Sequence, residues 1–173
     1  MTTDTLADTK RDAIRAQVEG AFGFVPNVVS EMLESPAATA AYLAGAGEMA
    51  EATLTGAEQQ VINVAISRRN GCKYCQAAHT ALAKAKGVSP ADLTALKAGD
   101  LPGDVELANL VSAAELLLEK QGHLGAGDLK ELEDQGITRE KVYEIIALIA
   151  LKTITNWVNH IANTKINEQF GDA

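Results

Sequence analysis

Two cysteines and one histidine lie close together in the middle of the chain, in the run Cys72-Lys73-Tyr74-Cys75 with His79 four residues later. The sequence of 173 residues contains no other cysteine. A thiolate is both a nucleophile and a metal ligand, whereas a free thiol with a pKa of about 8.5 is mostly protonated at neutral pH. Such a cluster indicates redox chemistry, metal binding or a structural link.

The spacing places these three side chains on one face of a helix. At about 100° per residue, Cys72, Cys75 and His79 fall within an arc of roughly 60°. Gly71 precedes them, so we expect the cysteines in the first turn of a helix, where the helix dipole favours a thiolate. Lys73 adds positive charge, and His79 can act as a base or hydrogen-bond partner for Cys75. A second thiol at this spacing can resolve a sulfenic acid or mixed disulfide.

Two other interpretations of the cysteine pair stay open. Metal binding by both thiolates and His79 would need a fourth ligand, and the other histidines are His123 and His160. An inert, structural Cys-x-x-Cys is the second alternative, although a disulfide across so short a loop adds little stability to a fold. The pattern favours a redox dithiol without metal or cofactor.

The sequence predicts an all-α fold in one domain over residues 1–173, because no segment alternates apolar and polar residues as a strand does. We expect about eight helices. Ser35, Thr55 with Glu58, and Thr138 are expected to cap three of them. The predicted segments span about 5–20, 26–34, 36–52, 55–70, 72–87, a short stretch from 90, 103–121, 127–135, and 138 to at least 163.

Polar residues interrupt the apolar segment before the cysteines in a regular pattern. Gln60, Asn63, Ser67 and Asn70 follow i, i+3, i+7, i+10 spacing and so form one stripe. The stripe is either a solvent-exposed face or the lining of a thiol pocket that carries a proton relay. The nearest carboxylate is Glu58, which can instead be engaged as a cap.

The last predicted helix is apolar on all sides over residues 145–151, which is typical of a core helix or a subunit interface. We therefore predict a homo-oligomer, with a purely intramolecular core helix as the alternative. Farther along, Asn156, Asn159 and His160 interrupt the apolar pattern beside Trp157. They belong either to an exposed helix end or to the thiol pocket.

Composition restricts the possible partners and the compartment. The formal charge of −8 argues against nucleic acid and anionic membranes. The polar start of the chain lacks the features of a signal peptide, and the longest apolar run is far shorter than the roughly 20 residues of a membrane span. We expect a soluble, cytoplasmic protein.

Several segments together resemble the alkylhydroperoxidase D-like, or carboxymuconolactone decarboxylase, family in its peroxidase-related branch. The most specific of them is Cys72-x-x-Cys75-x-x-x-His79 preceded by Asn70-Gly71. The others are Glu58–Val61, Ser67–Asn70, Phe22–Asn27, Ser35-Pro36, Leu151–Thr153, Asn156 and Asn159-His160.

The resemblance implies an all-α fold that forms dimers, trimers or hexamers, and a peroxidase or disulfide-reductase activity without haem or metal. It implies that Cys75 attacks the peroxide, that Cys72 resolves the product, and that His79 relays the proton of Cys75 through water to a glutamate. The position of that glutamate is Gln60 in this chain.

The chain departs from the family pattern at this relay, because a glutamine cannot accept the relayed proton. Either Glu58 takes its place, or His79 works alone, or peroxidase turnover is weak. Tyr74 also differs, since it stands where the best-known peroxidase has a histidine. The decarboxylase branch generally lacks the cysteine pair, so a lyase acting on a small cyclic acid is disfavoured.

The sequence thus predicts a thiol-dependent peroxidase that reduces a hydroperoxide at Cys75 and Cys72 with assistance from His79. A dithiol or thioredoxin-like partner would regenerate the thiols. The alternatives are a disulfide reductase that does not act on peroxide, or a thiol protein that senses redox state.

Overall fold

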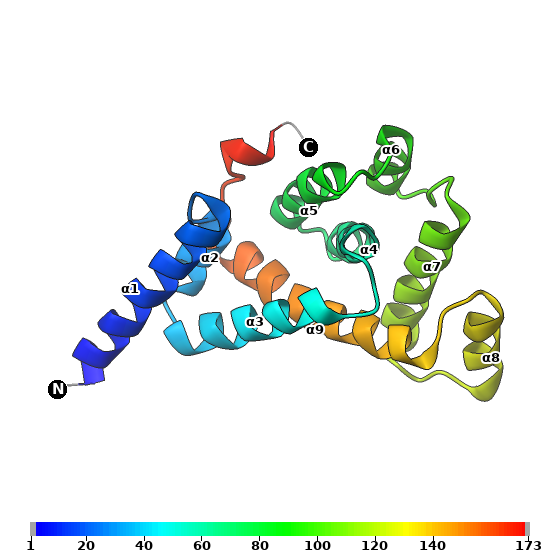
Figure 1. The fold of residues 1–173 in the computed structure, drawn as a ribbon, viewed down its shortest axis with the longest axis horizontal. Coiled ribbons are helices and arrows are strands. Elements are labelled where there is room, and N and C mark those ends of the chain that lie inside the picture. The colour runs from blue at the N-terminus through cyan, green and yellow to red at the C-terminus, as the bar shows by residue number, and fades with distance from the viewer. Residues whose placement is uncertain (1–2, 172–173) are drawn as a thin grey trace.

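The computed structural model describes residues 3–171, and over this range the chain is helical and contains no strand (Figure 1). The all-α prediction is confirmed. The α-helices are α1 (Thr3–Phe22), α2 (Asn27–Met32), α3 (Pro36–Glu48), α4 (Gly56–Arg69), α5 (Lys73–Ala85), α6 (Pro90–Ala98), α7 (Val105–Lys120), α8 (Ala126–Asp134) and α9 (Arg139–Ala162). Two 3-10 turns, η1 (Met49–Glu51) and η2 (Glu168–Phe170), complete the described chain.

The predicted caps start the helices. The Ser35 hydroxyl accepts a hydrogen bond from the Ala38 amide, and Thr138 caps α9 in the same way. Thr55 and Glu58 form a reciprocal capping box at the start of α4. These side chains satisfy amide groups that the first turn of a helix leaves unpaired.

Helix α4 lies at the centre of the molecule, where Figure 1 shows it between α5, α7 and α9. It packs against these three helices and against α6. The central position explains why seven consecutive residues of α4 are buried: Val61, Ile62, Asn63, Val64, Ala65, Ile66 and Ser67. Two of these residues are polar, and Asn63 Oδ1 and Ser67 Oγ are buried without a hydrogen-bond partner in the described chain.

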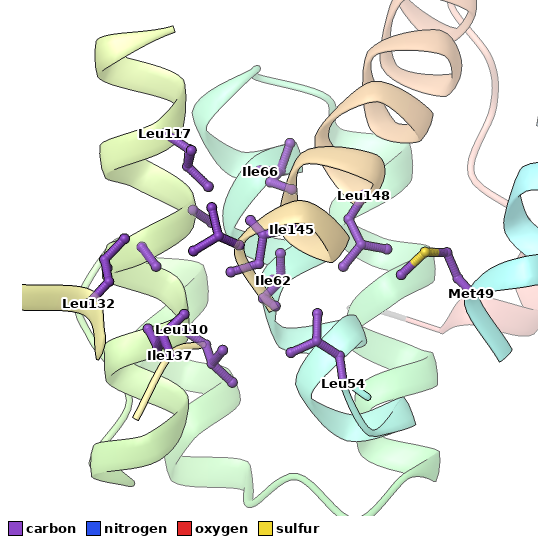
Figure 2. Packing of buried hydrophobic residues seen from close by; sticks show 13 residues of the cluster. Met49, Leu54, Ile62, Ile66, Leu110, Leu117, Leu132, Ile137, Ile145 and Leu148 are labelled. Carbon is purple, nitrogen blue, oxygen red and sulfur yellow. The ribbon is translucent and has the colours of Figure 1, made fainter. Parts of the chain in front are cut away.

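The main hydrophobic core lies where α4, α7 and α9 meet (Figure 2). Ile62 and Ile66 of α4 belong to one cluster with Leu117 of α7 and with Ile145 and Leu148 of α9. Aliphatic side chains dominate this cluster, as expected for a chain with 4% aromatic residues. The core fixes α9 beside α4, which brings the polar residues farther along α9 toward α5.

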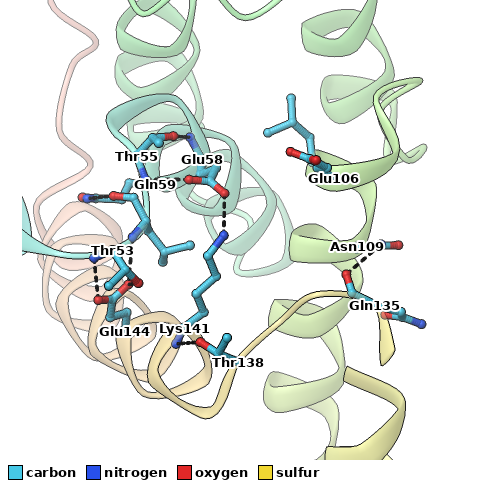
Figure 3. Close-up of polar contacts among 12 residues, drawn as sticks. Thr53, Thr55, Glu58, Gln59, Glu106, Asn109, Gln135, Thr138, Lys141 and Glu144 are labelled. Carbon is cyan, nitrogen blue, oxygen red and sulfur yellow. Dashed lines mark hydrogen bonds and ion pairs between the residues drawn. The ribbon is translucent and has the colours of Figure 1, made fainter. Parts of the chain in front are cut away.

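Two polar contacts hold the start of α9 next to the start of α4 (Figure 3). The Glu144 carboxylate accepts hydrogen bonds from the Thr53 amide at 2.7 Å and the Leu54 amide at 2.9 Å. Lys141 pairs with Glu58, with 2.9 Å between Nζ and Oε1. Since these carboxylates satisfy loop and cap amides, they determine how the two helices align.

Helix α9 is long and apolar enough to cross a membrane by length and composition, with a mean hydropathy of 1.3 in its most apolar window. The sequence-based expectation considered only the uninterrupted apolar run, which Lys152 ends. In the structure α9 packs against α2, α3, α4, α5 and α7. It also buries Lys152, Asn156 and Asn159. These contacts are those of a core helix in a folded domain.

One side of α9 nevertheless carries large apolar residues that are exposed in the single chain. We call this surface the α9 apolar face; its members are Tyr143, Ile146, Ile154, Trp157 and Ile161. At about 100° per residue these positions fall within an arc of roughly 80°. Trp157 is 63% exposed and Ile161 is 85% exposed. An apolar stripe of this kind is a common mark of a protein interface.

Replacement of a buried valine on α7 tests the core. We expect Val111→Ala, at a side chain 2% exposed, to lower the free energy of unfolding. The loss should be about 2 kcal/mol, because two buried methyl groups and their contacts are removed. Thermal unfolding should show a melting temperature lower by about 4–8 °C. The control Val105→Ala, on the same helix but 72% exposed, should leave the melting temperature nearly unchanged. Equal losses in the two variants would contradict the packing described.

Candidate active site

The turn between α4 and α5 places both cysteines inside the protein. Gly71 adopts the left-handed conformation with φ of 70°, which a residue with a side chain rarely takes. Cys72 follows as the N-cap of α5, and Cys75 lies in the first turn. Both are free thiols, 1% and 3% exposed respectively. The predicted position at a helix start is therefore the observed one.

Side chains from α9 surround the two sulfur atoms. The Asn159 amide nitrogen lies 3.2 Å from Cys75 Sγ and 3.7 Å from Cys72 Sγ. Thr155 Oγ1 lies 3.8 Å from Cys75 Sγ. Asn159 thus belongs to the thiol site rather than to an exposed helix end, whereas His160 is exposed. Because an amide N–H donates to sulfur, this environment favours a thiolate.

The two thiols differ in acidity. The hydrogen bond from Cys72, together with the charge of Lys152, lowers the pKa of Cys75 to about 6 in spite of burial. The same hydrogen bond and burial raise the pKa of Cys72. The pair therefore keeps one proton on Cys72 and a negative charge on Cys75 at neutral pH.

Lys152 is a buried cation next to this thiolate. Its side chain comes from α9, is 3% exposed, and contacts His79 Nε2 through Nζ. Among the ion pairs found in residues 3–171, none involves Lys152. A lysine is rarely buried without a partner. Lys152 was not among the predicted site residues, although a single charge interrupting an apolar helix was the available signal.

His79 is held in one tautomer by its two neighbours. A lysine ammonium can only donate hydrogen bonds, so Nε2 of His79 must accept one from Lys152. Nδ1 then carries the ring proton and donates it to Gln60 Oε1 at 2.7 Å. Burial and the charge of Lys152 hold the pKa of His79 well below its usual value. The ring is therefore neutral, and both of its nitrogens are engaged away from the thiols.

The two ends of the predicted polar stripe on α4 contact α5 and α9. Gln60 reaches His79, and the Asn70 amide donates to Asn156 Oδ1 of α9 at 2.8 Å. Asn63 and Ser67 between them are buried. Glu58 is not brought to the thiols, because its carboxylate accepts from the Thr55 amide and pairs with Lys141.

A cavity of about 550 Å³ opens onto Cys75, His79, Lys152 and Thr155. Cys72 is not among the residues that line it. A molecule in the cavity thus meets Cys75 first, while Cys72 lies behind it. The walls are mainly apolar and aromatic, from Phe22, Phe24, Pro26, Val28, Val29, Tyr42, Leu43, Ala46, Tyr74, Ala78, Ala81, Leu82 and Phe170.

Tyr74, between the cysteines, anchors the end of the described chain. Its hydroxyl donates to Asn167 Oδ1 at 2.6 Å and accepts from the Val28 amide at 3.3 Å. The ring of Phe170 packs edge-on against it, with ring centroids 5.8 Å apart. A C-terminal segment thereby becomes one wall of the cavity. No motif or periodicity in the sequence predicts this contact.

The metal-binding interpretation requires three or more suitable ligands close together. Within residues 3–171 no such group of histidine, cysteine, aspartate and glutamate side chains occurs. His79, the proposed third ligand, directs its ring nitrogens at Gln60 and Lys152. The donors around the sulfur atoms are amide and hydroxyl groups suited to stabilising a thiolate.

Comparison with known proteins gives one family and several related folds. Residues 34–119 match the model of the carboxymuconolactone decarboxylase family. A search of curated proteins gives no significant match.

Solved structures resemble the chain over nearly its whole length. One of them is an alkylhydroperoxidase core, an uncharacterized peroxidase-related protein from Ralstonia eutropha JMP134, which is 24% identical to this chain in sequence. The two superimpose with a TM-score of 0.82, and the aligned region covers 94% of this chain and 87% of that protein. A peroxidase-related protein from Silicibacter sp. TM1040 has 20% identity and a TM-score of 0.81, with 93% and 86% covered. The debrominase Bmp8, bound to 2,3,4-tribromopyrrole in one variant, has 18% identity and a TM-score of 0.71, with 98% and 91% covered. These likenesses establish a shared fold.

The unequal acidity of the thiols leads to a testable pH dependence. We expect iodoacetamide to alkylate native Cys75 with a half-maximal rate near pH 6, because only the thiolate reacts. Cys72 should stay unmodified until the protein is unfolded, since it is buried and its pKa is raised. Mass spectrometry of peptides after timed alkylation measures both rates. A midpoint near the free-thiol value of about 8.5 would contradict the assignment.

Proposed function

The chain belongs to the carboxymuconolactone decarboxylase family, and from this premise we propose that it is a thiol-dependent hydroperoxide reductase. One observation carries the proposal: the thiol with the lowered pKa, Cys75, opens onto the apolar cavity, and a second thiol lies directly behind it. Attack on a peroxide needs an acidic thiol that the substrate can reach, and resolution needs a second thiol close to it. Cys75 and Cys72 meet these two requirements.

In the proposed reaction, the Cys75 thiolate attacks the terminal oxygen of a hydroperoxide. An S–O bond forms, the O–O bond breaks, and Cys75 becomes a sulfenic acid. Cys72 then attacks the Cys75 sulfur, so that an S–S bond forms and water leaves. Oxidation of Cys75 removes the negative charge that kept the proton on Cys72, which makes Cys72 easier to ionise at this step.

An external dithiol would then reduce the disulfide and restore both thiols. A small dithiol or a thioredoxin-like protein is the partner that this chemistry requires. A cytoplasmic location agrees with the scheme, because that compartment keeps thiols reduced. The apolar walls of the cavity favour a hydroperoxide with an apolar body as substrate.

The residues of the expected proton relay take other roles in this proposal. Gln60 cannot accept a proton, and Nε2 of His79 is already engaged by Lys152. Gln60 therefore orients His79, and His79 holds Lys152 beside the thiolate. Glu58 takes no part, because its carboxylate is engaged in the cap of α4 and with Lys141.

We also propose that copies of the chain associate through the α9 apolar face. Five large apolar side chains on one stripe would be partly removed from water by a second copy. An interface formed by the same surface on two subunits is the usual arrangement in homodimers.

Substitution of each cysteine tests the peroxidase proposal. With cumene hydroperoxide and dithiothreitol, Cys75→Ser should lose at least about 100-fold in turnover, because the nucleophile is gone. Cys72→Ser should turn over more slowly, and without reductant it should consume about one equivalent of peroxide per chain and end as a Cys75 sulfenic acid, because no second thiol is present to form the disulfide. Peroxide consumption and mass spectrometry of the products give both quantities.

Two results would redirect the assignment. If Cys75→Ser stays active while Cys72→Ser does not, the roles of the thiols are reversed. If the wild type turns over no hydroperoxide, although its Cys72–Cys75 disulfide still forms and is reduced again in exchange with other disulfides and thiols, the protein is a disulfide reductase or a redox sensor.

Charge placed on the α9 apolar face tests the assembly. We expect Trp157→Glu to reduce the mass of the particle in solution, because a carboxylate in an apolar interface would lose its hydration. Size-exclusion chromatography with light scattering measures that mass. Val105→Glu, at a site that is also largely exposed but lies outside this face, is the matched control. A wild type that is monomeric at high concentration would rule out the proposed interface.

A further inference from the structure

Reduction of a hydroperoxide has a second requirement besides a thiolate. As the O–O bond breaks, the departing oxygen becomes an alkoxide, which is a poor leaving group unless it receives a proton. Cys75 cannot supply that proton, because it attacks as the thiolate. A proton donor must therefore stand in the same cavity.

Lys152 meets the conditions for that donor. Lys152 lines the same cavity as Cys75, and its charge acts on the Cys75 sulfur. It is 3% exposed and forms no ion pair with a carboxylate within the described chain. In such a site the anion that compensates the ammonium is the Cys75 thiolate.

The other titratable groups at the cavity are less suited to the role. The ring proton of His79 is donated to Gln60, and its Nε2 has no proton to give. The Tyr74 hydroxyl donates to Asn167, and burial raises its pKa to about 12. Cys72 donates its proton to Cys75 and does not line the cavity. Tyr42 also lines the cavity, so a Tyr42→Phe variant is needed to separate its contribution from that of Lys152.

We propose that Lys152 is the general acid of hydroperoxide reduction, a role that rests on the peroxidase function proposed above. As Cys75 Sγ bonds to the terminal oxygen, the O–O electron pair passes to the departing oxygen. That oxygen takes a proton from Lys152 Nζ and leaves as an alcohol. Cys75 becomes a sulfenic acid, and Lys152 becomes a neutral amine.

The proton returns at the end of the cycle. Cys72 condenses with the sulfenic acid, and its proton leaves in the water that is released. The reducing dithiol then converts the disulfide to two thiols and becomes a disulfide itself. Cys75, now protonated, transfers its proton to the neutral amine of Lys152. The thiolate and ammonium are restored, and the sum is one hydroperoxide and one dithiol converted to an alcohol, water and a disulfide.

The contact with His79 fits this role. A neutral imidazole fixes one N–H of the ammonium without neutralising its charge. A carboxylate in the place of Gln60 would favour a positively charged His79, which would repel Lys152. The glutamine therefore keeps the ring neutral and the ammonium free to serve the thiolate and the substrate.

The test compares two peroxides with different leaving groups. Cumene hydroperoxide releases an alkoxide, which needs a proton, whereas peroxybenzoic acid releases a carboxylate, which does not. Single-turnover rates are measured for the wild type, Lys152→Met, Lys152→Arg and Tyr42→Phe. Lys130→Met, on the exposed surface of α8, controls for the loss of one lysine charge. Iodoacetamide alkylation of each variant corrects the rates for the thiolate fraction.

We expect the corrected rate with cumene hydroperoxide to fall by about 100-fold or more in Lys152→Met. The corrected rate with peroxybenzoic acid should stay within a few-fold of the wild type. Lys152→Arg should behave in the same way, because arginine keeps the charge but does not release a proton at neutral pH. If Lys152→Met does not fold, the rates of Lys152→Arg alone decide whether Lys152 donates the proton.

Equal losses with the two peroxides would overturn the proposal and leave Lys152 only an electrostatic role. A selective loss in Tyr42→Phe instead would assign the acid to Tyr42. If the wild type reduces neither peroxide although Cys75 is alkylated as a thiolate, the peroxidase function itself is wrong, and the acid role falls with it.

Discussion

The attraction between a buried thiolate and a buried ammonium is the interaction on which the site depends. In water such a pair contributes little, but between packed helices its charges have few competing dipoles. Each neighbour serves one of the two charges: Asn159 donates to the sulfur atoms, and His79 accepts from Lys152. Loss of either partner would leave the other charge buried and uncompensated, so the two must be retained together.

The architecture meets this demand by surrounding one helix with others. Helix α4 is buried along its middle, and polar side chains near its two ends reach α5 and α9, Gln60 at His79 and Asn70 at Asn156. Aliphatic packing at one end of α9 fixes the helix firmly, as Figure 2 shows. Beyond that region the same helix carries the polar groups of the site. Hydrophobic packing thus provides the rigidity, and a few interior polar residues provide the chemistry.

Local signals explain why much of the fold was predictable from sequence. Caps such as Ser35 and Thr55 act within a few residues, and Gly71 marks a turn by its own backbone. The third helix was predicted too long, because η1 replaces its last turn before the loop to α4. The spacing of the cysteines and His79 likewise follows from a single helix.

The parts of the site that escaped prediction join distant segments. Lys152 and His79 are 73 residues apart, and Tyr74 and Asn167 are 93 apart. Periodicity in one sequence carries no information about such pairs. Gln60 was predicted as part of the polar stripe and through the resemblance, but its role in fixing the His79 tautomer depends on the position of Lys152. The difference in acidity between the two thiols therefore could not be predicted from the sequence alone.

Helix α9 has two unlike sides, and the only tryptophan of the chain lies on it. Trp157 is on the apolar face, while Thr155 and Asn159, two residues to either side, contact the sulfur atoms. Indole fluorescence of the native protein therefore originates from one known position on the helix that contacts the redox centre. The emission wavelength of this indole reports, without an added label, whether the apolar face is exposed to solvent or buried against another surface. Stopped-flow fluorescence can follow this wavelength during oxidation of the thiols.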